Sequence, residues 1–376
     1  MAPPDLIVRT EVEADAPHLL LEPDLRAEVT GFLEPRAAAI DAVDGVENGA
    51  AGIREALAFL NGRALAAAGD DRGPNGDLSR VAQTIATAAY SDMSVAFSLW
   101  CQRMVLEYLA GAPPGSPLRT AVLPRLLRTE VLGSTALAAA MAHHVAQAPL
   151  PVVWRPQNGA LVVEGRVNWA SNLFPPHFVM VTAAAPAADG RALIVALAGD
   201  TPGLCIEPYP RLLALQATGS SSVAFRGARV PREWIVADDF TPFITRVRPV
   251  FLLLQSSFCW GLAYRALVEA RTALRGVNEV FGGDLEALEA RAARLARALR
   301  AGANDRGAAA PIRELVKLRL DCAQLATAAV ALEAKVVGGR GYATTSATAR
   351  RVREAAFLPI QAPTEGQLRW ELSRSA

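Results

Sequence analysis

The spacing of apolar residues changes twice along this chain. From about Asp24 to Arg128 they recur every three or four positions, as on one face of a helix. Short β-branched segments follow between Pro151 and Val236, separated by turn formers. From Pro249 onward the helical spacing returns in long segments joined by short loops, which is typical of a bundle. This order predicts an α+β fold with an N-terminal helical domain, a small middle β-barrel and a C-terminal four-helix bundle.

The length agrees with several domains. A chain of 376 residues exceeds the ~100 to 200 residues of one typical domain, so two or three domains are expected. We place the helical domain at 1–128, the β domain at 129–238 and the bundle at 239–376. The predicted helices cover 25–42, 52–68 and 78–110 before the β domain, and 262–274, 284–301 and 311–337 after it.

The turn formers inside the β region are grouped in three places. They are Gln157-Asn-Gly, Ala188-Asp-Gly and Thr201-Pro-Gly, and each group is typical of a hairpin turn. The β region therefore reads as a series of hairpins.

Charge and hydropathy exclude two classes of partner. A formal net charge of +1 supplies no field that would neutralise phosphates, so nucleic acid is not expected as a partner. The apolar run from Val250 to Trp260 is shorter than the ~18 to 20 residues needed to cross a bilayer. We expect a buried helix there and no membrane span.

The cysteines indicate the compartment. Cys101, Cys205, Cys259 and Cys322 lie far apart, with no Cys-x-x-Cys and no Cys/His spacing typical of a metal site. A reduced, cytoplasmic protein without a bound metal is the expectation.

One segment of the β region could present a flat surface to a cofactor. Gly165-Arg-Val-Asn-Trp-Ala-Ser-Asn172 offers an indole beside a hydroxyl and an amide. It resembles the Gly-x-Lys-x-Trp-Ile-Thr-Asn segment of the acyl-CoA dehydrogenases, whose Trp packs against the flavin of FAD and whose Thr reaches the flavin's reactive nitrogen. The resemblance implies FAD as the cofactor, with Trp169 and Ser171 at the flavin.

A second segment resembles another part of that family's FAD site. Arg128-Thr-Glu-Val-Leu-Gly-Ser-Thr135 is similar to Thr-Glu-Pro-x-x-Gly-Ser, one residue shorter and with Val131 in place of Pro. The resemblance implies that Thr129 meets the pyrimidine side of the flavin and that Ser134 meets the pyrophosphate. Gly133 would let backbone N–H groups approach an anion.

A third segment implies a second subunit. Lys335-Val-Val-Gly-Gly-Arg-Gly-Tyr342 looks like the family's Gln-x-x-Gly-Gly-x-Gly-Phe/Tyr, in which a helix ends in glycines that hold part of a neighbouring subunit's FAD. Carried over, Lys335, Gly338 and Gly339 would contact that FAD. The resemblance then implies a homodimer or homotetramer.

The fourth segment departs from the family at the catalytic residue. Phe357-Leu-Pro-Ile-Gln-Ala-Pro-Thr-Glu-Gly-Gln-Leu368 resembles the segment whose Ile-Tyr-Glu-Gly-Thr provides the base that removes the α-proton. Position by position, the Glu falls on Ala362 and the Thr, a cofactor contact, on Thr364. Alanine cannot take a proton. Glu365, three residues later, is the candidate base, and an exposed glutamate at the start of the last helix is the alternative.

Another departure concerns the FAD pyrophosphate. The family has an Arg three residues before a Phe-Gly pair, where Asn278 stands in this chain. Losing a bidentate phosphate contact would weaken FAD binding.

Three functions remain open from the sequence. The first is an FAD-dependent oxidoreductase of fatty acid metabolism that dehydrogenates an acyl-CoA or a carrier-bound acyl thioester and passes electrons to a partner, with Ser171 donating a hydrogen bond to the reduced flavin. The second is a flavin monooxygenase or oxidase that takes reduced flavin from a reductase and needs no α-proton base. The third is a non-catalytic subunit that binds an acyl thioester or serves a structural role.

Overall fold

The computed structural model describes residues 18–41, 46–63, 65, 76–146, 148–209 and 211–374, with the backbone alone for 46–50. The chain divides into two compact units. Unit 1 contains Met1–Asp41, Asp77–Ala96 and Leu252–Ala376, and unit 2 contains Ala42–Gly76 and Phe97–Phe251. Two long helices, α5 (Met93–Ala110) and α8 (Phe240–Ala273), each contribute to both units.

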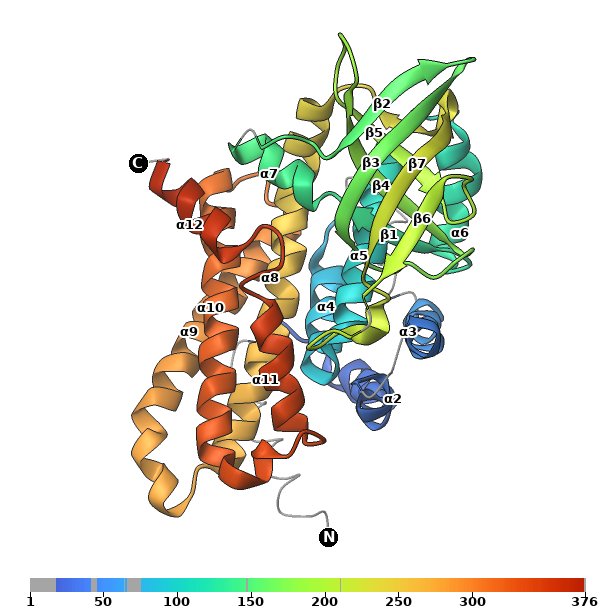
Figure 1. Cartoon of the computed structure of the whole chain (residues 1–376). Coiled ribbons are helices and arrows are strands. Elements are labelled where there is room, and N and C mark those ends of the chain that lie inside the picture. The colour runs from blue at the N-terminus through green and yellow to red at the C-terminus, as the bar shows by residue number, and fades with distance from the viewer. Residues whose placement is uncertain are drawn as a thin grey trace. The chain divides into compact units, whose positions relative to one another are not determined.

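The described residues of unit 1 form helices joined by loops, and no strand lies among them (Figure 1). Besides its parts of α5 and α8 it contains α2 (Pro23–Asp41), α4 (Ser79–Ser91), η5 (Gly276–Phe281), α9 (Gly282–Asn304), α10 (Ile312–Val337), η6 (Gly338–Tyr342), α11 (Ala347–Phe357) and α12 (Glu365–Arg374).

Helix α10 is the centre of the bundle. It packs against α9, α11 and α12. Its buried residues recur every three or four positions and include Leu315, Leu318, Cys322, Leu325 and Ala329. This is the spacing that the sequence showed, so burial of that face accounts for the position of the helix.

Helix α8 is long and apolar enough to cross a bilayer, yet its most apolar 18-residue window is wholly buried inside the protein. The expectation of a buried helix at 250–260 is confirmed.

Unit 2 is built on one mixed sheet of eight strands (Figure 1). The strands are β1 (Leu132–Ala136), β2 (Val152–Gln157), β3 (Ala160–Ala170), β4 (Phe178–Pro186), β5 (Leu193–Ala198), β6 (Leu204–Pro208), β7 (Ser221–Pro231) and β8 (Ile235–Ala237). Their order is β6-β7-β3-β2-β4-β5-β8, and β1 pairs with β4 in parallel. The unit also holds α3 (Val46–Asn61), η2 (Leu118–Val122), α6 (Leu123–Leu127), α7 (Ala138–Ala146), η3 (Gln216–Thr218) and η4 (Arg232–Trp234).

Two of the three predicted hairpins form. Asn158 and Gly159, both at positive φ, join β2 to β3, and the turn ending at Gly190 joins the antiparallel pair β4 and β5. The turn at Thr201–Gly203 does not make a hairpin, because β5 pairs with β4 and β8 while β6 pairs with β7. Thr201-Pro-Gly203 does form a turn, but turn-forming residues alone do not determine which strands pair.

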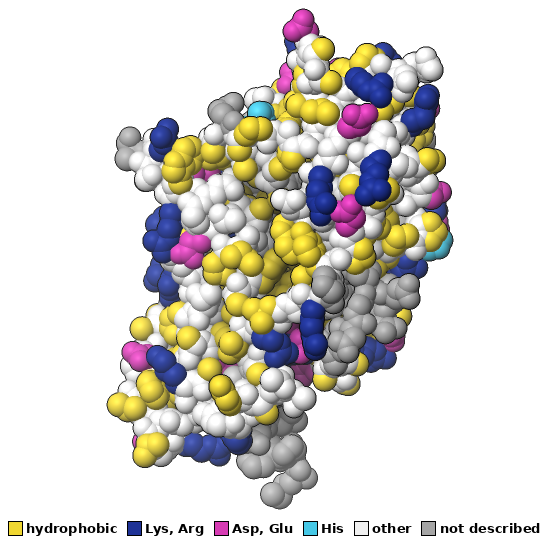
Figure 2. Space-filling model, viewed as in Figure 1, with side chains coloured by type: hydrophobic (Ala, Val, Ile, Leu, Met, Phe, Trp, Pro, Cys, Tyr) yellow, Lys and Arg dark blue, Asp and Glu magenta, His cyan; other side chains and the backbone are white. Residues whose placement is uncertain are grey.

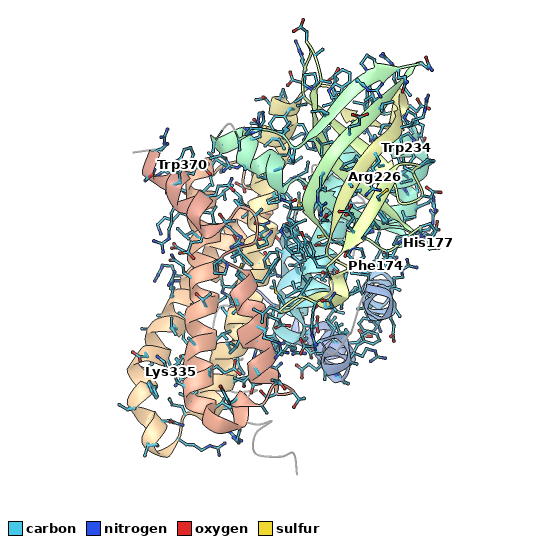
Figure 3. All side chains as sticks on the ribbon, viewed as in Figure 1. Phe174, His177, Arg226, Trp234, Lys335 and Trp370 are labelled. Carbon is cyan, nitrogen blue, oxygen red and sulfur yellow. The ribbon has the colours of Figure 1, made fainter. Side chains whose placement is uncertain are left out.

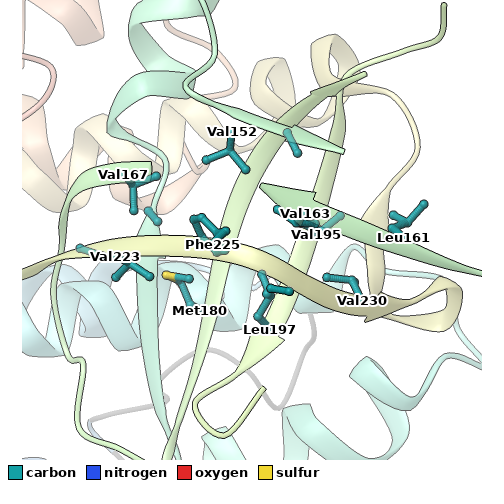
Figure 4. Close-up of a cluster of buried hydrophobic side chains, with 14 of the residues drawn as sticks. Val152, Leu161, Val163, Val167, Met180, Val195, Leu197, Val223, Phe225 and Val230 are labelled. Carbon is teal, nitrogen blue, oxygen red and sulfur yellow. The ribbon is translucent and has the colours of Figure 1, made fainter. Parts of the chain in front are cut away.

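The sheet has one apolar core (Figure 4). Side chains from β1, β2, β3, β4, β5 and β7 meet in it, and valine, a residue favoured in strands, is the commonest among them. They include Val152, Leu161, Val163, Phe178, Met180, Val195, Val223, Phe225 and Val230. In β4 and β5 the positions between these residues are also buried, so these two strands are buried on both faces.

The fold class predicted from the sequence is confirmed. Two predicted helices differ clearly from the observed ones. The helix predicted at 262–274 begins much earlier, since α8 starts at Phe240. The segment 78–110 is not one helix: α4 ends at Ser91, Asp92 is extended, and α5 starts at Met93. The predicted domain boundaries at 128 and 238 stay predictions.

Candidate functional site

The exposed end of β3 carries the indole singled out by the sequence. Trp169 is 50% exposed and stacks on Tyr209, with ring centroids 4.3 Å apart and planes 22° apart. Tyr209 is held in turn by a hydrogen bond from its hydroxyl to the carbonyl oxygen of Asn168, at 3.2 Å. With Tyr209 on one face, the exposed part of the indole is available to a flat ring.

Ser171 begins a chain of three hydroxyl groups. Its Oγ lies 2.6 Å from Ser220 Oγ, which lies 2.7 Å from Thr218 Oγ1. Thr218 Oγ1 donates to the carbonyl oxygen of Leu215 at 2.7 Å. Ser171 is 7% exposed and Thr218 is fully buried, so the chain runs from the edge of the unit into its interior.

Asn172 fixes this edge to the rest of unit 2. It is fully buried at a φ of 61°, and its Nδ2 donates to the carbonyl oxygens of Ser98 and Gly133 at 2.9 and 3.0 Å. Asparagine tolerates the left-handed backbone region better than most residues. The Asn of the motif therefore positions Trp169 and Ser171.

The structure does not support the predicted approach of Gly133 and Ser134 to a pyrophosphate. The Gly133 N–H donates to Gln102 Oε1 at 2.5 Å, and a Cβ at this glycine would lie 2.6 Å from Val105. The glycine thus allows β1 to pack on α5. Ser134 is fully buried, and its Oγ has no hydrogen-bond partner among the described residues.

Thr129 is partly exposed at a φ of 54°, with its Oγ1 donating to the carbonyl oxygen of Arg128 at 2.7 Å. Its predicted flavin contact stays a prediction.

In unit 1, Ala362 stands at the position matched to the family's base. Its neighbours are two neutral glutamines and, through them, one arginine. The carbonyl oxygen of Ala362 accepts from Gln255 Nε2 at 3.0 Å and from Gln361 Nε2 at 2.9 Å. Both glutamines accept from the fully buried Arg319, whose Nε donates to Gln255 Oε1 at 3.0 Å and whose second amino group donates to Gln361 Oε1 at 2.7 Å. None of these side chains can take up a proton at neutral pH.

Glu365 is the first residue of α12, as the alternative reading expected. Its carboxylate accepts from Arg369 Nε at 2.7 Å and from Gln324 Nε2 at 3.3 Å. The hydrogen bond from Arg369 lowers the pKa of Glu365, and Gln324 acts in the same direction. A poised general base has a pKa raised toward neutral, and the shift at Glu365 is in the opposite direction. Its role as the base stays a prediction.

The other predicted contacts of unit 1 fall in two separate places. Thr364 Oγ1 accepts from the Gln367 N–H at 3.2 Å and so caps α12. Lys335 lies eleven residues beyond Gln324 along α10, about 16 Å at 1.5 Å per residue. Figure 3 labels Lys335 and, on α12, Trp370, at opposite ends of α10.

Two of the three glycines after Lys335, Gly338 and Gly339, are open to solvent. Gly338 has a φ of 64°, and a Cβ at Gly338 or Gly339 would meet nothing within 4 Å. Asn278, which stands where the family has an Arg, donates to the carbonyl oxygen of Val336 at 2.8 Å. Asn278 thus ties η5 to the end of α10, and the contact with a neighbouring subunit's FAD stays a prediction.

Two buried carboxylates lie elsewhere in unit 1. Arg350 Nε and Glu354 Oε1 are 3.7 Å apart, and an Arg350 terminal nitrogen is 3.8 Å from Asp92 Oδ2. Burial raises the pKa of Glu354 to about 7, with Arg350 opposing it, and raises the pKa of Asp92. This cluster joins α11 to the junction of α4 and α5.

No group of three His, Cys, Asp or Glu side chains among the described residues could hold a metal ion. On the face seen in Figure 2, Lys and Arg side chains are scattered among Asp and Glu side chains.

Sequence reasoning missed several residues of these sites. Tyr209, Thr218 and Gln255 lie far along the chain from the motifs that they support. Two of these positions are marked in the sequence. Ser220-Ser-Ser222 is a polar run at the start of β7, and Gln255 interrupts the apolar run of α8.

Comparisons with known proteins agree with this architecture. No protein-family model matches the chain. Amino sugar nitrososynthase RubN8 of Streptomyces rubradiris is 33% identical over 163 residues, which are 41% of this chain and 37% of that protein, so the match spans little more than a third of this relative.

Solved structures match over nearly the whole chain. An acyl-CoA dehydrogenase of Geobacillus kaustophilus has a TM-score of 0.81 at 16% identity, covering 94% of this chain and 98% of that one. An acyl-CoA dehydrogenase of Bacillus anthracis complexed with FAD has a TM-score of 0.76 at 13% identity, covering 97% and 69%. The chain therefore has the acyl-CoA dehydrogenase fold.

Proposed function

We propose that this protein is an FAD-dependent monooxygenase built on the acyl-CoA dehydrogenase fold. The observation that carries the proposal is the setting of Ala362. Its neighbours are Gln255, Gln361 and, through them, Arg319. Dehydrogenation of a thioester needs a base for the α-proton, whereas oxygenation by a reduced flavin does not.

The pKa of Glu365 supports the same choice. A carboxylate paired with Arg369 and hydrogen-bonded to Gln324 is stabilised in its charged form, so its affinity for a proton is reduced. The named activity of the nitrososynthase relative also favours oxygen chemistry, because a nitroso group requires oxygen on nitrogen.

The residues at the end of β3 fit a flavin. The half-exposed indole of Trp169 would stack on the ring system, with Tyr209 supporting its other face. Ser171 would hydrogen-bond at the edge of the ring, and Asn172 holds both side chains in place through Ser98 and Gly133. Because the buried Ser134 does not reach a phosphate as it lies, we expect weak FAD binding.

A weakly held flavin suits a cofactor that arrives reduced. One oxygen atom of O₂ enters the substrate and the other leaves as water, with two electrons and two protons coming from reduced flavin. A flavin reductase would supply the reduced FAD as a partner protein. An amine is the substrate class to test first, given the amino sugar in the relative's name.

The test is an isotope experiment. The protein is supplied with reduced FAD by a flavin reductase and NADH, with catalase present, under ¹⁸O₂ and a panel of amino sugars. Mass spectrometry should find one ¹⁸O per hydroxylamine product. An anaerobic titration of the FAD-loaded protein with acyl-CoAs runs in parallel, and we expect no bleaching of the flavin band.

Two variants make the result specific. Trp169→Ala should weaken FAD binding about tenfold, whereas Trp370→Ala, another partly exposed tryptophan, should not. Bleaching by any acyl-CoA without O₂ would overturn the proposal and return the search to dehydrogenation, with Glu365→Gln as the next variant.

A further inference from the structure

The three hydroxyl groups in unit 2 can form their hydrogen bonds together only if each proton points in one particular direction. Three oxygens, Ser171 Oγ, Ser220 Oγ and Thr218 Oγ1, share hydrogen bonds of 2.6 and 2.7 Å, and the chain ends on the carbonyl oxygen of Leu215. A hydroxyl group carries one proton and can donate only one hydrogen bond, while a carbonyl oxygen only accepts.

Because each hydroxyl has one proton, the donor in each of these hydrogen bonds can be assigned. Thr218 donates its proton to the carbonyl oxygen of Leu215. It cannot also donate to Ser220, so Ser220 donates to Thr218. The proton of Ser220 is then used, and Ser171 must donate to Ser220. All three bonds form together only in this direction.

Burial and backbone hydrogen bonds around Thr218 stabilise this assignment of donors and acceptors. Thr218 is fully buried, and the Leu215 carbonyl oxygen that ends the chain also accepts the Thr218 N–H at 3.1 Å. The carbonyl oxygen of Thr218 accepts the Asn172 N–H at 2.8 Å, so the same residues that order the chain also hold the segment next to Ser171. In a buried setting the loss of any of these bonds would leave an unsatisfied polar group.

From this direction we infer that Ser171 presents a lone pair, and no proton, to the cofactor, and that Ser220 and Thr218 are positioning residues that make the site prefer reduced over oxidised flavin. The inference rests on the proposed function, in which Ser171 hydrogen-bonds at the edge of the flavin ring, and on the resemblance, which implies the reactive nitrogen as the atom that it meets. That nitrogen carries a proton in the reduced ring and a bare lone pair in the oxidised ring. Ser171 can therefore accept a hydrogen bond from the reduced form, and its lone pair would face another lone pair in the oxidised form.

This reverses the role expected for Ser171 from the sequence. A serine that donates would favour the oxidised ring, as a dehydrogenase awaiting substrate requires. A serine that accepts favours a flavin delivered in reduced form by a reductase.

The test compares two dissociation constants in each variant. Equilibrium dialysis measures the affinity for oxidised FAD in air and for dithionite-reduced FAD under nitrogen. Ser220→Ala frees the proton of Ser171, so the preference for reduced over oxidised FAD should fall about tenfold, the value of one hydrogen bond at the upper end of its usual range. Thr218→Val should change the preference in the same direction, because Ser220 could then donate toward Ser171.

Ser221→Ala is the matched control. Its Oγ donates to the carbonyl oxygen of Gly219 at 3.2 Å and is not part of the chain, so the ratio should stay at the wild-type value. A change in folding alone would weaken both forms of FAD equally and leave the ratio unmoved.

The possible outcomes separate the two proposals. If both forms of FAD bind and Ser220→Ala leaves their ratio unchanged, the assignment of Ser171 as an acceptor is wrong while the proposed function stands. If the wild-type protein binds neither form, the proposed function fails and this inference fails with it.

Discussion

Arg319 is a fully buried arginine in the first half of α10, and its guanidinium donates to the side-chain oxygens of Gln255 and Gln361. The Arg319→Met variant keeps much of the apolar stem and removes the donors. Both glutamine oxygens would then lack their donor, and each unsatisfied buried group costs about 1 to 3 kcal/mol. We expect a loss of about 3 kcal/mol in the free energy of unfolding, measured by urea denaturation.

Arg313→Met provides the comparison on the same helix. Arg313 is exposed and donates to the carbonyl oxygen of Leu372 at 2.9 Å, so its loss should cost less than about 0.5 kcal/mol. Equal losses in the two variants would mean that the buried network contributes nothing beyond an ordinary surface arginine.

Candidate residues that share one short segment could be proposed from the sequence, whereas the residues that support them from distant parts of the chain could not. Trp169 and Ser171 lie in one octapeptide, and the structure places both at the edge of unit 2. Ser134 was assigned to a phosphate from its motif alone, yet the packing of β1 leaves it fully buried. The cluster around Arg319 joins three elements, and each of its residues is unremarkable in its own segment.

At the level of helices, replacing either of two glycines by alanine should have different effects on stability. A Cβ at Gly261 of α8 would lie 2.1 Å from the backbone oxygen of Ala86 in α4, and one at Gly302 of α9 would lie 2.7 Å from the tip of Leu253. A backbone oxygen can yield only if a helix moves, so Gly261→Ala should cost about 2 to 3 kcal/mol.

Gly302→Ala should be close to neutral. The end of a leucine side chain can rotate away, and alanine gains about 1 kcal/mol over glycine in a helix. The midpoints of urea unfolding of both variants decide the matter, and a stable Gly261→Ala protein would show that α4 and α8 can separate at little cost.

The order of helical and β regions could be predicted because each type of periodicity persists over a long segment. The break between α4 and α5 could not be predicted, because the apolar spacing continues through it. Asp92 is extended there, and its Oδ1 accepts the Val95 N–H at 2.9 Å, which starts α5. An aspartate inside an otherwise apolar stretch was the available signal. The pairing of β6 with β7 depends on contacts across the sheet, which local turn residues do not report.

At the scale of the whole chain, length and periodicity predicted helical and β regions in the right order, but the compact units do not follow that order. Unit 1 takes residues from three separate segments, and α5 and α8 each run through both units. Which segments share a core depends on long-range packing, so a division by sequence position could not have given it.

The buried cluster of Asp92, Arg350 and Glu354 should make the stability of the protein depend on pH. Burial raises the pKa of Glu354 from 4.5 to about 7, so between these values the folded state holds a proton that the unfolded state has released. The contribution of Glu354 to the free energy of unfolding is therefore fully present below about pH 4.5 and is lost as the pH rises through about 7. The full effect of such a shift is on the order of 3 kcal/mol.

Glu354→Gln removes the titrating group and keeps an oxygen that can accept the Met93 N–H. The fall in stability between pH 5 and 8 should become shallower in this variant, measured as urea midpoints at each pH. Glu365→Gln is the matched control, because the pKa of Glu365 is lowered and its stabilising effect is lost only below this range. A Glu354→Gln protein with the wild-type slope would mean that Glu354 is already ionised in the folded state at pH 5, and the cluster would then be a permanent ion pair.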